Sequence, residues 1–324
     1  MSFISVLFAL LLEQARPLNR GNIIHAAVRS WVRWSARTLD AGKPVHGWLV
    51  WGLAVGGPSL VAMVIYWLLG YWVGWPLAVL WSALVLYASL GFRQFSFHFT
   101  QIRDALAQGD DALAQRLLAD WQHADAKDLP RAEIISRVIE TSVLAAHRHV
   151  FGVLAWFSVL AALGMGPVGA VLYRLGEFVA RYWQHQSESH HQPISDALQA
   201  QARQAWAVID WLPARVTAIS FAVVGNFEEA IDAWRRYAQQ AEPRNDGLVL
   251  AATAGAVNIA LRSHVGRAYP DAYAPAAMTL GDDVTAGRSA PELPHLAIVV
   301  GLVWRTVVMW VLLLALLTLA RLLG

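Results

Sequence analysis

Ionisable residues interrupt one of the most apolar stretches of the chain. In WAVIDWLPARVTAISFAVVG, residues 206–225, Asp210 and Arg215 flank Pro213. Each charged group inside hydrocarbon costs about 2.5–3.5 kcal/mol on insertion scales, so this pair could cancel most of the gain from its apolar neighbours. Proline cannot donate a helical hydrogen bond, but it suits the first turn of a helix. The pattern therefore predicts a break, with one helix ending near Asp210 and another beginning near Pro213.

Irregular backbone at membrane depth is tolerated where it faces protein or a wet cavity. We therefore expect residues 206–225 to line a cavity, with the Asp210 and Arg215 side chains pointing into it. The alternative is an amphipathic helix on the membrane surface, with both side chains at the lipid headgroups. Whether this stretch spans, re-enters or lies on the surface is left open.

A second group of polar residues precedes another apolar run. HRHVFGVLAWF places His147, Arg148 and His149 where they could hold a phosphate or a carboxylate, or serve as an interfacial anchor. Glu140 lies seven residues before His147, close to two helical turns, so both fall on one helix face and either share a site or are solvated. Arg93, in GFRQF, follows an apolar run, a position typical of an anchor.

Histidines gather in HQSESHHQ, which supplies His185, His190 and His191. Adjacent histidines on regular structure point apart, and no carboxylate pair at ligand spacing accompanies them. We interpret this stretch as a solvated loop and predict no metal site. Cysteine is absent from the sequence, which excludes disulfides, thiolate metal sites and cysteine nucleophiles.

A turn pattern, Asn245-Asp246-Gly247, leads into a helix rich in small residues. The turn could offer backbone donors to a ligand. Small residues let helices approach closely, so we predict tight packing around residues 251–256.

The composition predicts an integral membrane protein. Of the 324 residues, 57% are hydrophobic and 15% are charged, whereas a soluble domain is nearer a quarter charged. The mean hydropathy is +0.42. The 16 Trp and 8 Tyr fit aromatic belts at the lipid headgroups, and the lipid bilayer is the first partner predicted. The net charge of +2 is not that of a strongly basic domain, so we predict no nucleic-acid partner.

Four apolar runs have about the length that crosses the hydrocarbon of a bilayer: residues 47–69, 71–91, 150–172 and 296–320. With residues 206–225, they predict an all-α, polytopic transmembrane helical bundle of about four or five spans, forming one integral membrane domain over residues 1–324. The first 12 residues are apolar but lack the features of a signal peptide, so we expect a tilted or partly inserted helix ending near Glu13.

Basic residues outnumber acidic ones before the first span, which predicts a cytoplasmic N-terminal segment. Residues 92–149 then lie in the cytoplasm, where apolar residues at three- and four-residue spacing predict a helical hairpin, broken at Gly109 and Asp110. Residues 226–294 begin as a helix and become irregular from Tyr269 onward, and their side of the membrane is left open.

Taken in order, several motifs resemble the adenosylcobinamide-phosphate synthase family of cobalamin biosynthesis, named CobD or CbiB, together with its relative AmpE. The motifs are FRQF with ALAQGDDALAQRLLADW, RVIETSVLAAHRHVFGVLAWF, GPVGAVLYR, IDWLPARVTAISFAVVG and PRNDGLVLAATAGAVNIAL. They cover most of the chain from about residue 80 to 270, and DWLPARVTA is the most specific piece.

The resemblance implies a multi-pass protein of the bacterial inner membrane. Such a protein would join an aminopropanol unit, or its phosphate, to a corrinoid carboxylate in an ATP-dependent amide ligation. Arg215 would bind an anionic group, and Asp210 would orient an amine or hold Arg215, in a polar, corrinoid-sized cavity. The catalytic candidates are Glu140, Asp210 and Arg215, and the substrate-binding candidates are Arg93, His147, His149, Asn245 and Gly247.

The sequence also departs from the synthase pattern. In the synthases an acidic, asparagine-bearing run follows the glutamate that Glu140 matches, but here the run is SVLAAHRH. YRLGEFVARYW lacks the synthase Asn-Thr-Leu-Asp motif, and LLEQARPLNRGN lacks a His-Pro motif. Amide ligation through an acyl phosphate usually uses a metal held on carboxylates, so ATP and Mg²⁺ are predicted only if synthase activity is retained.

The alternative function is a non-catalytic membrane sensor or signalling protein of the AmpE type, which is linked to β-lactamase induction. A homo-oligomer and a membrane partner both stay open for either function.

Overall fold

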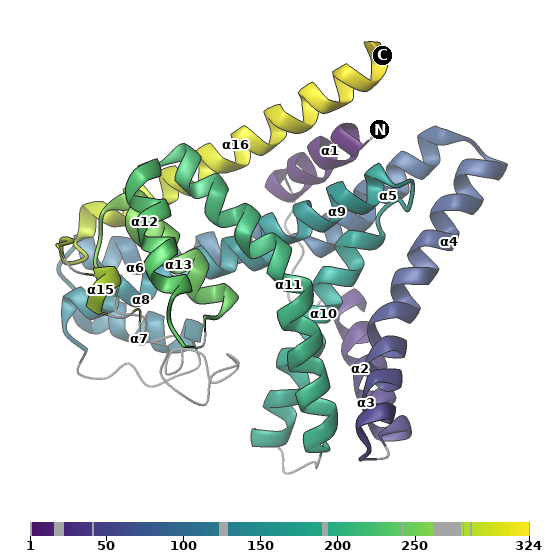
Figure 1. The fold of residues 1–324 in the computed structure, drawn as a ribbon, viewed down its shortest axis with the longest axis horizontal. Coiled ribbons are helices and arrows are strands. Elements are labelled where there is room, and N and C mark those ends of the chain that lie inside the picture. The colour runs from purple at the N-terminus through teal and green to yellow at the C-terminus, as the bar shows by residue number, and fades with distance from the viewer. Residues whose placement is uncertain are drawn as a thin grey trace. The chain divides into compact units, whose positions relative to one another are not determined.

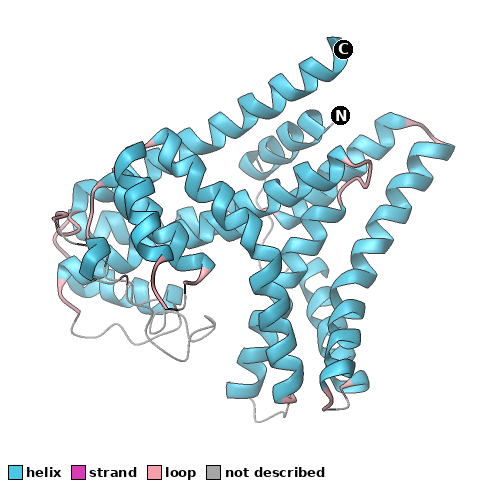
Figure 2. Cartoon of the chain, viewed as in Figure 1, coloured by secondary structure: helices cyan, strands magenta, loops and turns pink. Residues whose placement is uncertain are grey.

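The protein is built from helices (Figure 2). The computed structural model describes residues 2–15, 23–40, 42–122, 129–189, 194–241, 243–261, 280, 282–285 and 287–323. Within these ranges there is no strand, and an isolated bridge pairs Ile259 with Ser289. The all-α prediction is confirmed.

The helices, in chain order and with the labels of Figure 1, are α1 (Ser2–Ala15), α2 (Ile23–Leu39), α3 (Pro44–Trp51), the π-helical turn η1 (Gly52–Gly56), α4 (Gly57–Trp72), α5 (Trp75–Ser89), α6 (Phe92–Ala107), α7 (Asp111–Gln122), α8 (Arg131–Ala146), the π-helical turn η2 (His147–Phe151), α9 (Gly152–Ala162), α10 (Val168–Ser189), α11 (Asp196–Val224), α12 (Phe227–Ala238), α13 (Asn245–Val257), α15 (Asp282–Thr285) and α16 (Leu293–Leu323).

The chain divides into two compact units. Unit 1 consists of Met1–Gly91, Arg148–Asp210 and Val311–Gly324, and unit 2 consists of Phe92–His147 and Trp211–Trp310. Three boundaries fall inside continuous helical stretches, so the α8–η2–α9 stretch, α11 and α16 each contribute residues to both units.

Among the described residues, four helical stretches are long and apolar enough to cross a membrane, by length and composition: Val45–Trp72, Arg131–Ala162, Asp196–Val224 and Leu293–Ala320. The first and last contain the predicted spans 47–69 and 296–320, and the third contains almost all of residues 206–225. The prediction of a polytopic helical bundle is confirmed. The second stretch begins inside residues 92–149, whose extramembrane position stays a prediction.

Two predicted spans have different bounds in the structure. The run 71–91 forms α5, which has 15 residues and is a shorter apolar helix. The run 150–172 is divided between two helices, because α9 ends at Ala162 and α10 begins only at Val168. Gly166 has a φ of +61°, and a Cβ there would lie 2.4 Å from the ring of Tyr66. The glycine therefore marks a turn between two helices, where the sequence predicted one span.

Aromatic side chains surround the turn between α4 and α5, where Gly74 has a φ of +110°. The side chains of Tyr71, Trp72 and Trp75 are 84%, 76% and 59% exposed. Amphipathic rings gather at the headgroup level of a bilayer. These three residues therefore fit a membrane–water interface at the end of the α4–α5 hairpin.

The predicted break at Gly109 and Asp110 is confirmed, and it separates α6 from α7. Gly109 has a φ of +78°, a left-handed conformation that favours glycine. Arg131, at the start of α8, holds this corner closed. Its Nη1 donates to Asp111 Oδ1 and its Nη2 donates to the carbonyl of Leu106, each at 2.6 Å.

Helices α12 and α13 pack tightly through small residues. A Cβ at Gly255 would lie 2.2 Å from the carbonyl oxygen of Glu229, which leaves no room for a larger side chain. Ala251, Ala252 and Ala254 are fully buried on α13. The tight packing predicted for residues 251–256 is confirmed.

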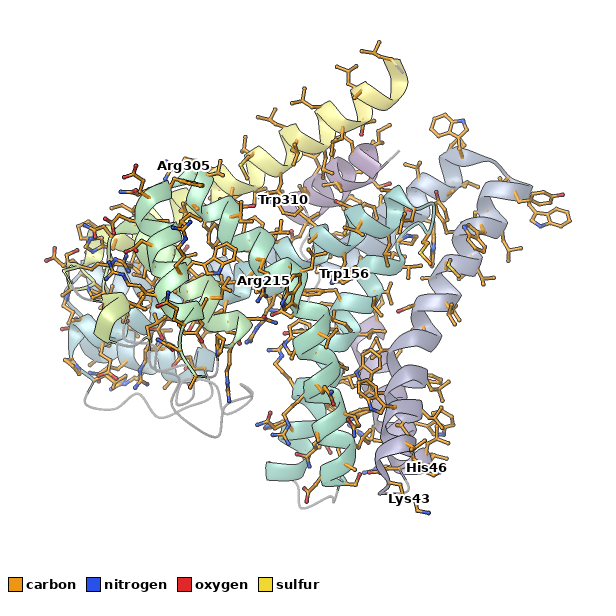
Figure 3. All side chains as sticks on the ribbon, in the orientation of Figure 1. Lys43, His46, Trp156, Arg215, Arg305 and Trp310 are labelled. Atoms are coloured by element: carbon orange, nitrogen blue, oxygen red, sulfur yellow. The ribbon has the colours of Figure 1, made fainter. Side chains whose placement is uncertain are left out.

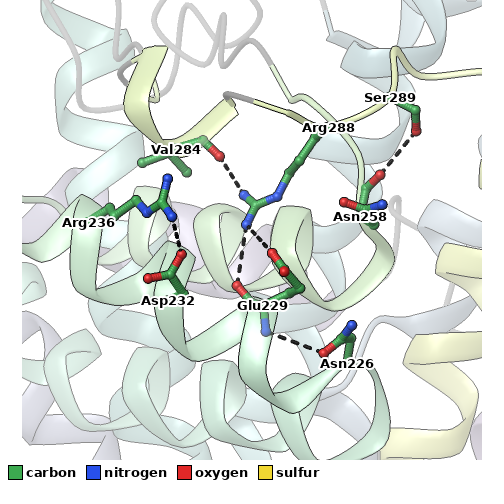
Figure 4. A network of polar contacts seen from close by, with 8 residues as sticks. All are labelled: Asn226, Glu229, Asp232, Arg236, Asn258, Val284, Arg288 and Ser289. Atoms are coloured by element: carbon green, nitrogen blue, oxygen red, sulfur yellow. Dashed lines mark hydrogen bonds and ion pairs between the residues drawn. The ribbon is translucent and has the colours of Figure 1, made fainter.

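A polar network ties the segment before α16 to these two helices (Figure 4). Arg288 Nη2 donates to both the carbonyl and the Oε2 of Glu229, each at 3.3 Å. Ser289 Oγ donates to the carbonyl of Asn258 at 3.1 Å, where α13 ends in a left-handed cap. These bonds fix the return of the chain toward α16.

Helix α11 is continuous through Pro213, so the predicted break between Asp210 and Pro213 is wrong. The proline removes the hydrogen bond that residue 213 would otherwise donate to the carbonyl of Ile209. Trp156 on α9, labelled in Figure 3, supplies the missing donor, because its Nε1 donates to the Ile209 carbonyl at 2.9 Å. One donor from a neighbouring helix therefore satisfies the carbonyl that the proline leaves open.

We expect Trp156→Phe to destabilise the protein by about 1–3 kcal/mol, because Ile209 keeps a buried carbonyl without its donor. Pro213→Ala in the same chain should recover part of that loss, because the N–H of residue 213 then bonds the carbonyl from within α11. Unfolding in detergent, followed by tryptophan fluorescence, measures the four members of this double-mutant cycle. The loss of indole volume in Trp156→Phe is the same on both backgrounds and cancels within the cycle. Strictly additive changes in the free energy of unfolding would therefore contradict a hydrogen bond from Trp156 that replaces the one lost at Pro213.

Candidate functional site

Six of the predicted site residues belong to unit 2, and five of them, all but Arg93, lie on three helices of that unit. Glu140 and His147 are on α8 and its end, Arg215 is on α11, and Asn245 and Gly247 are on α13. Helices α8 and α13 are in contact. We call Glu140, His147, Arg215, Asn245 and Gly247 the unit 2 cluster, and Arg215 is labelled in Figure 3.

The α8 side of the cluster is buried. Glu140 is 2% exposed, and its Oε1 accepts a hydrogen bond from Ser136 Oγ at 3.0 Å, one turn earlier on the helix. His147 is fully buried, and its Nδ1 lies 3.0 Å from Thr217 Oγ1 of α11. His147 begins the π-helical turn η2, and such turns occur frequently at functional sites. The sequence therefore places a carboxylate and an imidazole inside the unit.

The α11 side of the cluster presents a guanidinium that is only partly buried. Arg215 Nη1 donates to the carbonyl of Trp211 at 3.0 Å, on its own helix, and to Asn245 Oδ1 of α13 at 3.4 Å. The Arg215 guanidinium carbon also lies 4.1 Å from the centre of the Trp211 ring, in a cation–π arrangement. These contacts orient a planar donor group of the kind that binds carboxylates and phosphates in pairs of hydrogen bonds.

The Asn245-Asp246-Gly247 sequence forms the first turn of α13, with Arg244 as the residue before the helix. The prediction of a separate turn before the helix is therefore wrong. The residues of a helix's first turn have backbone N–H groups with no partner inside the helix. The expected backbone donors thus come from a helix start, with Gly247 buried within it.

Asp210 and His149 belong to unit 1. Asp210 is fully buried, and its Oδ1 accepts a hydrogen bond from the hydroxyl of Tyr173 on α10 at 2.8 Å. A Cβ at Gly152 would lie 2.2 Å from the Tyr173 hydroxyl oxygen, so glycine is required for α10 to approach α9 closely. Burial raises the pKa of Tyr173 well above its usual value, and the Asp210 carboxylate raises it further, so the phenol stays a neutral donor.

An ion triad that the sequence did not reveal lies on the same helix, α10. Glu177 is fully buried and pairs with both Arg174 and Arg181. Burial alone would raise the pKa of the Glu177 carboxyl, but the guanidinium groups of Arg181 and Arg174 outweigh it and lower the pKa to about 2. Spacings of three and four residues placed these charges on one helix face, a pattern that could have indicated the triad.

The remaining candidates are placed as follows. His149 lies beside Gly91, with its Cγ 3.6 Å from where a Cβ of that glycine would be. Arg93 is on α6, but its side chain lies outside the described residues. His185 is on α10 rather than in the predicted loop, and His190 and His191 lie outside the described residues. Sequence reasoning also missed Ser136, Thr217 and Tyr173, the hydrogen-bond partners of the candidates.

A metal site would need several His, Asp or Glu side chains grouped around one point. Among the residues that the structure describes, no three such side chains are grouped to hold a metal ion. No residues are therefore assigned to the Mg²⁺ that a retained synthase activity implies, and no chemical step is assigned to it.

Comparisons with known proteins agree on one family. The model of the family described as CobD/Cbib protein matches residues 10–290. The Cobalamin biosynthesis protein CobD of Stutzerimonas stutzeri (strain A1501) is 28% identical over 325 residues, covering 96% of each chain. The protein of the same name from Chromobacterium violaceum is 29% identical over 222 residues, covering 65% of this chain and 66% of the relative. No solved structure gives a significant match.

The Glu177 triad should make the stability of the protein depend on pH in acid. The Glu177 carboxyl has a pKa of about 2 in the folded protein, against an ordinary value of 4.5. Its contribution to the free energy of unfolding is therefore present above pH 4.5 and is lost as the pH falls toward 2. Glu177→Gln should lower the free energy of unfolding at pH 7 by about 3 kcal/mol. This is the lower end of the range for breaking a buried ion pair, because the Arg174 and Arg181 side chains are 23% and 24% exposed.

Thermal unfolding in detergent between pH 2 and pH 7 measures this effect. The difference between wild type and Glu177→Gln should narrow below pH 4.5. Asp232→Asn is the matched control, since Asp232 and Arg236 form an exposed i,i+4 pair, and it should change stability by no more than about 0.5 kcal/mol. A Glu177→Gln difference that is constant over this pH range would contradict the assignment.

Proposed function

The chain belongs to the CobD/CbiB family, and on that premise we propose that this membrane protein acts in cobalamin biosynthesis, joining aminopropanol or its phosphate to a corrinoid carboxylate. The observation that carries the proposal is the unit 2 cluster. Its buried carboxylate, imidazole, guanidinium and amide come from distant parts of the sequence, and α8, α11 and α13 hold them within one unit.

Each group in the cluster has a part in binding the two substrates. Arg215 is suited to an anionic group, either the corrinoid carboxylate or the phosphate of aminopropanol phosphate. Its bond to Asn245 Oδ1 orients the guanidinium before a ligand arrives. The Glu140 carboxylate, buried beside Ser136, is suited to the ammonium form of the amine.

Amide formation requires an activated carboxylate and a neutral amine. ATP would supply the phosphoryl group that activates the carboxylate as an acyl phosphate. The amine nitrogen then forms the C–N bond as the C–O bond to phosphate breaks, and the nitrogen loses a proton. Glu140 is the carboxylate of the cluster, and a carboxylate is a group suited to accept that proton as a general base.

A second function is favoured by the residues that follow Glu140. In SVLAAHRH, the residues Ser142, Val143, Leu144, Ala145, Ala146, His147 and Arg148 are buried. Four of these are apolar core residues at positions where the synthases carry acidic and asparagine residues. A non-catalytic, AmpE-like sensor would keep the binding groups of the unit 2 cluster and use them to detect a ligand rather than to join two.

Complementation separates the two functions. In a strain lacking its cobinamide-phosphate synthase, the gene should restore growth that depends on cobalamin made from cobyric acid. No growth, with the protein present in the membrane at normal levels, would rule out ligation. The sensor function instead expects altered β-lactamase induction after deletion of the gene, and unchanged induction would count against it.

Arg215→Ala should abolish whichever function the chain has, while the protein stays in the membrane. Arg305→Ala is the matched control, because Arg305 is an exposed arginine of unit 2 whose Nε donates to the carbonyl of Gly301 on its own helix (Figure 3). Growth, or β-lactamase induction, is measured for both variants beside their amounts in membranes. A fully active Arg215→Ala variant would remove the unit 2 cluster from the proposal.

A further inference from the structure

We propose that unit 1 binds one anionic phospholipid in a groove between α2 and α10, with its headgroup on two arginines and an acyl chain in an adjoining apolar cavity. The α2–α10 groove consists of two hollows. One is an apolar cavity of about 710 Å³ and the other is a polar pocket of about 300 Å³, and both α2 and α10 line each of them. This inference does not depend on the proposed function of the unit 2 cluster.

The apolar cavity has the lining expected for a hydrocarbon chain. Its walls come from α2, α4, α5 and α10 and are mostly aliphatic and aromatic. Three polar side chains of the wall bond within the protein. Trp31 Nε1 donates to the carbonyl of Ala54, Trp81 Nε1 donates to that of Ala62, and Arg174 pairs with Glu177. The cavity therefore offers apolar surface rather than polar recognition to its ligand.

The polar pocket has a positive wall. Arg33 and Arg37 of α2 line it at a spacing of four residues, which places them on one face of the helix. Asp40 is the acidic residue in its lining, and its carboxylate accepts hydrogen bonds from other parts of the chain. Its oxygens accept hydrogen bonds from the backbone N–H and hydroxyl of Ser195, at 2.9 and 2.8 Å, and from the N–H of Gly42 at 3.0 Å. The two arginines thus dominate the charge that a ligand would meet.

Helix α10 holds α2 in place along the groove. Trp183 Nε1 donates to the carbonyl of Val32 at 3.4 Å, and Arg33 Nε donates to the Tyr182 hydroxyl at 3.1 Å. In Figure 1 these two helices lie near α4, which contacts α10. Hydrogen bonds between α2 and α10 therefore hold the two walls of the groove together.

The length of the groove favours a phospholipid over a small anion. On α10, residues 171–178 line the apolar cavity and residues 182–186 line the polar pocket. About ten residues separate the centres of these two ranges, which corresponds to about 15 Å of helix. That is half of the roughly 30 Å hydrocarbon thickness of a bilayer, the depth of one leaflet. On α2, residues 24–31 line the apolar cavity and residues 33–37 line the polar pocket, in the same order along the helix.

The orientation predicted from the sequence places α2 at the cytoplasmic leaflet, where anionic lipids attract basic helices. Ordinary annular lipid would fill the apolar cavity without any preference for its headgroup. Selectivity for an anionic headgroup is therefore the property that identifies a site, and it depends on Arg33 and Arg37.

Native mass spectrometry of the full chain in detergent, titrated with phosphatidylglycerol or phosphatidylcholine of the same acyl chains, tests the proposal. The wild type should bind one phosphatidylglycerol with about tenfold preference. Arg33→Gln/Arg37→Gln should lose that preference, whereas Arg235→Gln/Arg236→Gln, which removes two exposed arginines of α12, should keep it. Equal binding of the two lipids by wild type, or unchanged preference in the groove variant, would overturn the proposal.

The tail and the headgroup are tested separately. Ala88→Trp, which fills the apolar cavity without changing charge, should weaken phosphatidylglycerol binding severalfold, and unchanged binding would contradict the assignment of the acyl chain. Glycerol 3-phosphate at the same concentration should not displace the lipid. Full displacement by glycerol 3-phosphate would show that the pocket takes a small phosphate instead. Unfolding profiles that match wild type establish that each variant is folded.

Discussion

Polar groups inside an apolar helical bundle must find partners without water, and this constraint shapes α11 and the helices around it. Pro213 deprives the Ile209 carbonyl of its donor, and the Trp156 indole replaces it. The next residue, Asp210, is a fully buried acid whose Oδ1 accepts the hydroxyl of Tyr173. Both donors come from the α9–α10 hairpin, in which glycines allow the helices to approach to backbone contact. The most unusual residues of α11 are therefore understood through a hairpin that lies earlier in the sequence.

The same constraint acts in unit 2, where it gives the polar residues fixed positions. Glu140 is held by Ser136 and His147 by Thr217, so neither side chain needs water to remain buried. Arg215 differs from them because it is only partly buried and bonds across to α13. A guanidinium that is oriented but not enclosed can accept a ligand with little rearrangement, and preorganisation of this kind lowers the entropic cost of binding. Unit 2 thus combines buried polar pairs with one oriented, partly exposed guanidinium.

Sequence patterns predicted features that depend on local composition. The helical class, the spans 47–69 and 296–320, and the break at Gly109 follow from apolar run lengths and from a glycine in a polar stretch. The break at Pro213 was predicted wrongly because the donor that repairs it lies 53 residues from Ile209 in the sequence, and no local pattern reveals it. The Glu177 triad was missed for a related reason. Arginines three and four residues from a glutamate are typical of a solvated helix face, and only the packed structure shows that the glutamate is fully buried.

Burial also bears on how the chain departs from the synthase pattern. The residues after Glu140, from Val143 to Ala146, are core residues of α8, and a carboxylate there would need charged or hydrogen-bonding partners to offset its desolvation. The apolar residues at these positions are therefore part of the packing of α8 and do not lie on an open surface. The groups kept nearby, the Glu140 carboxylate and the Arg215 guanidinium, are suited to an amine and to an anion. Binding such a ligand is a property that both candidate functions require, whereas catalysis additionally requires charge stabilisation at the acyl phosphate.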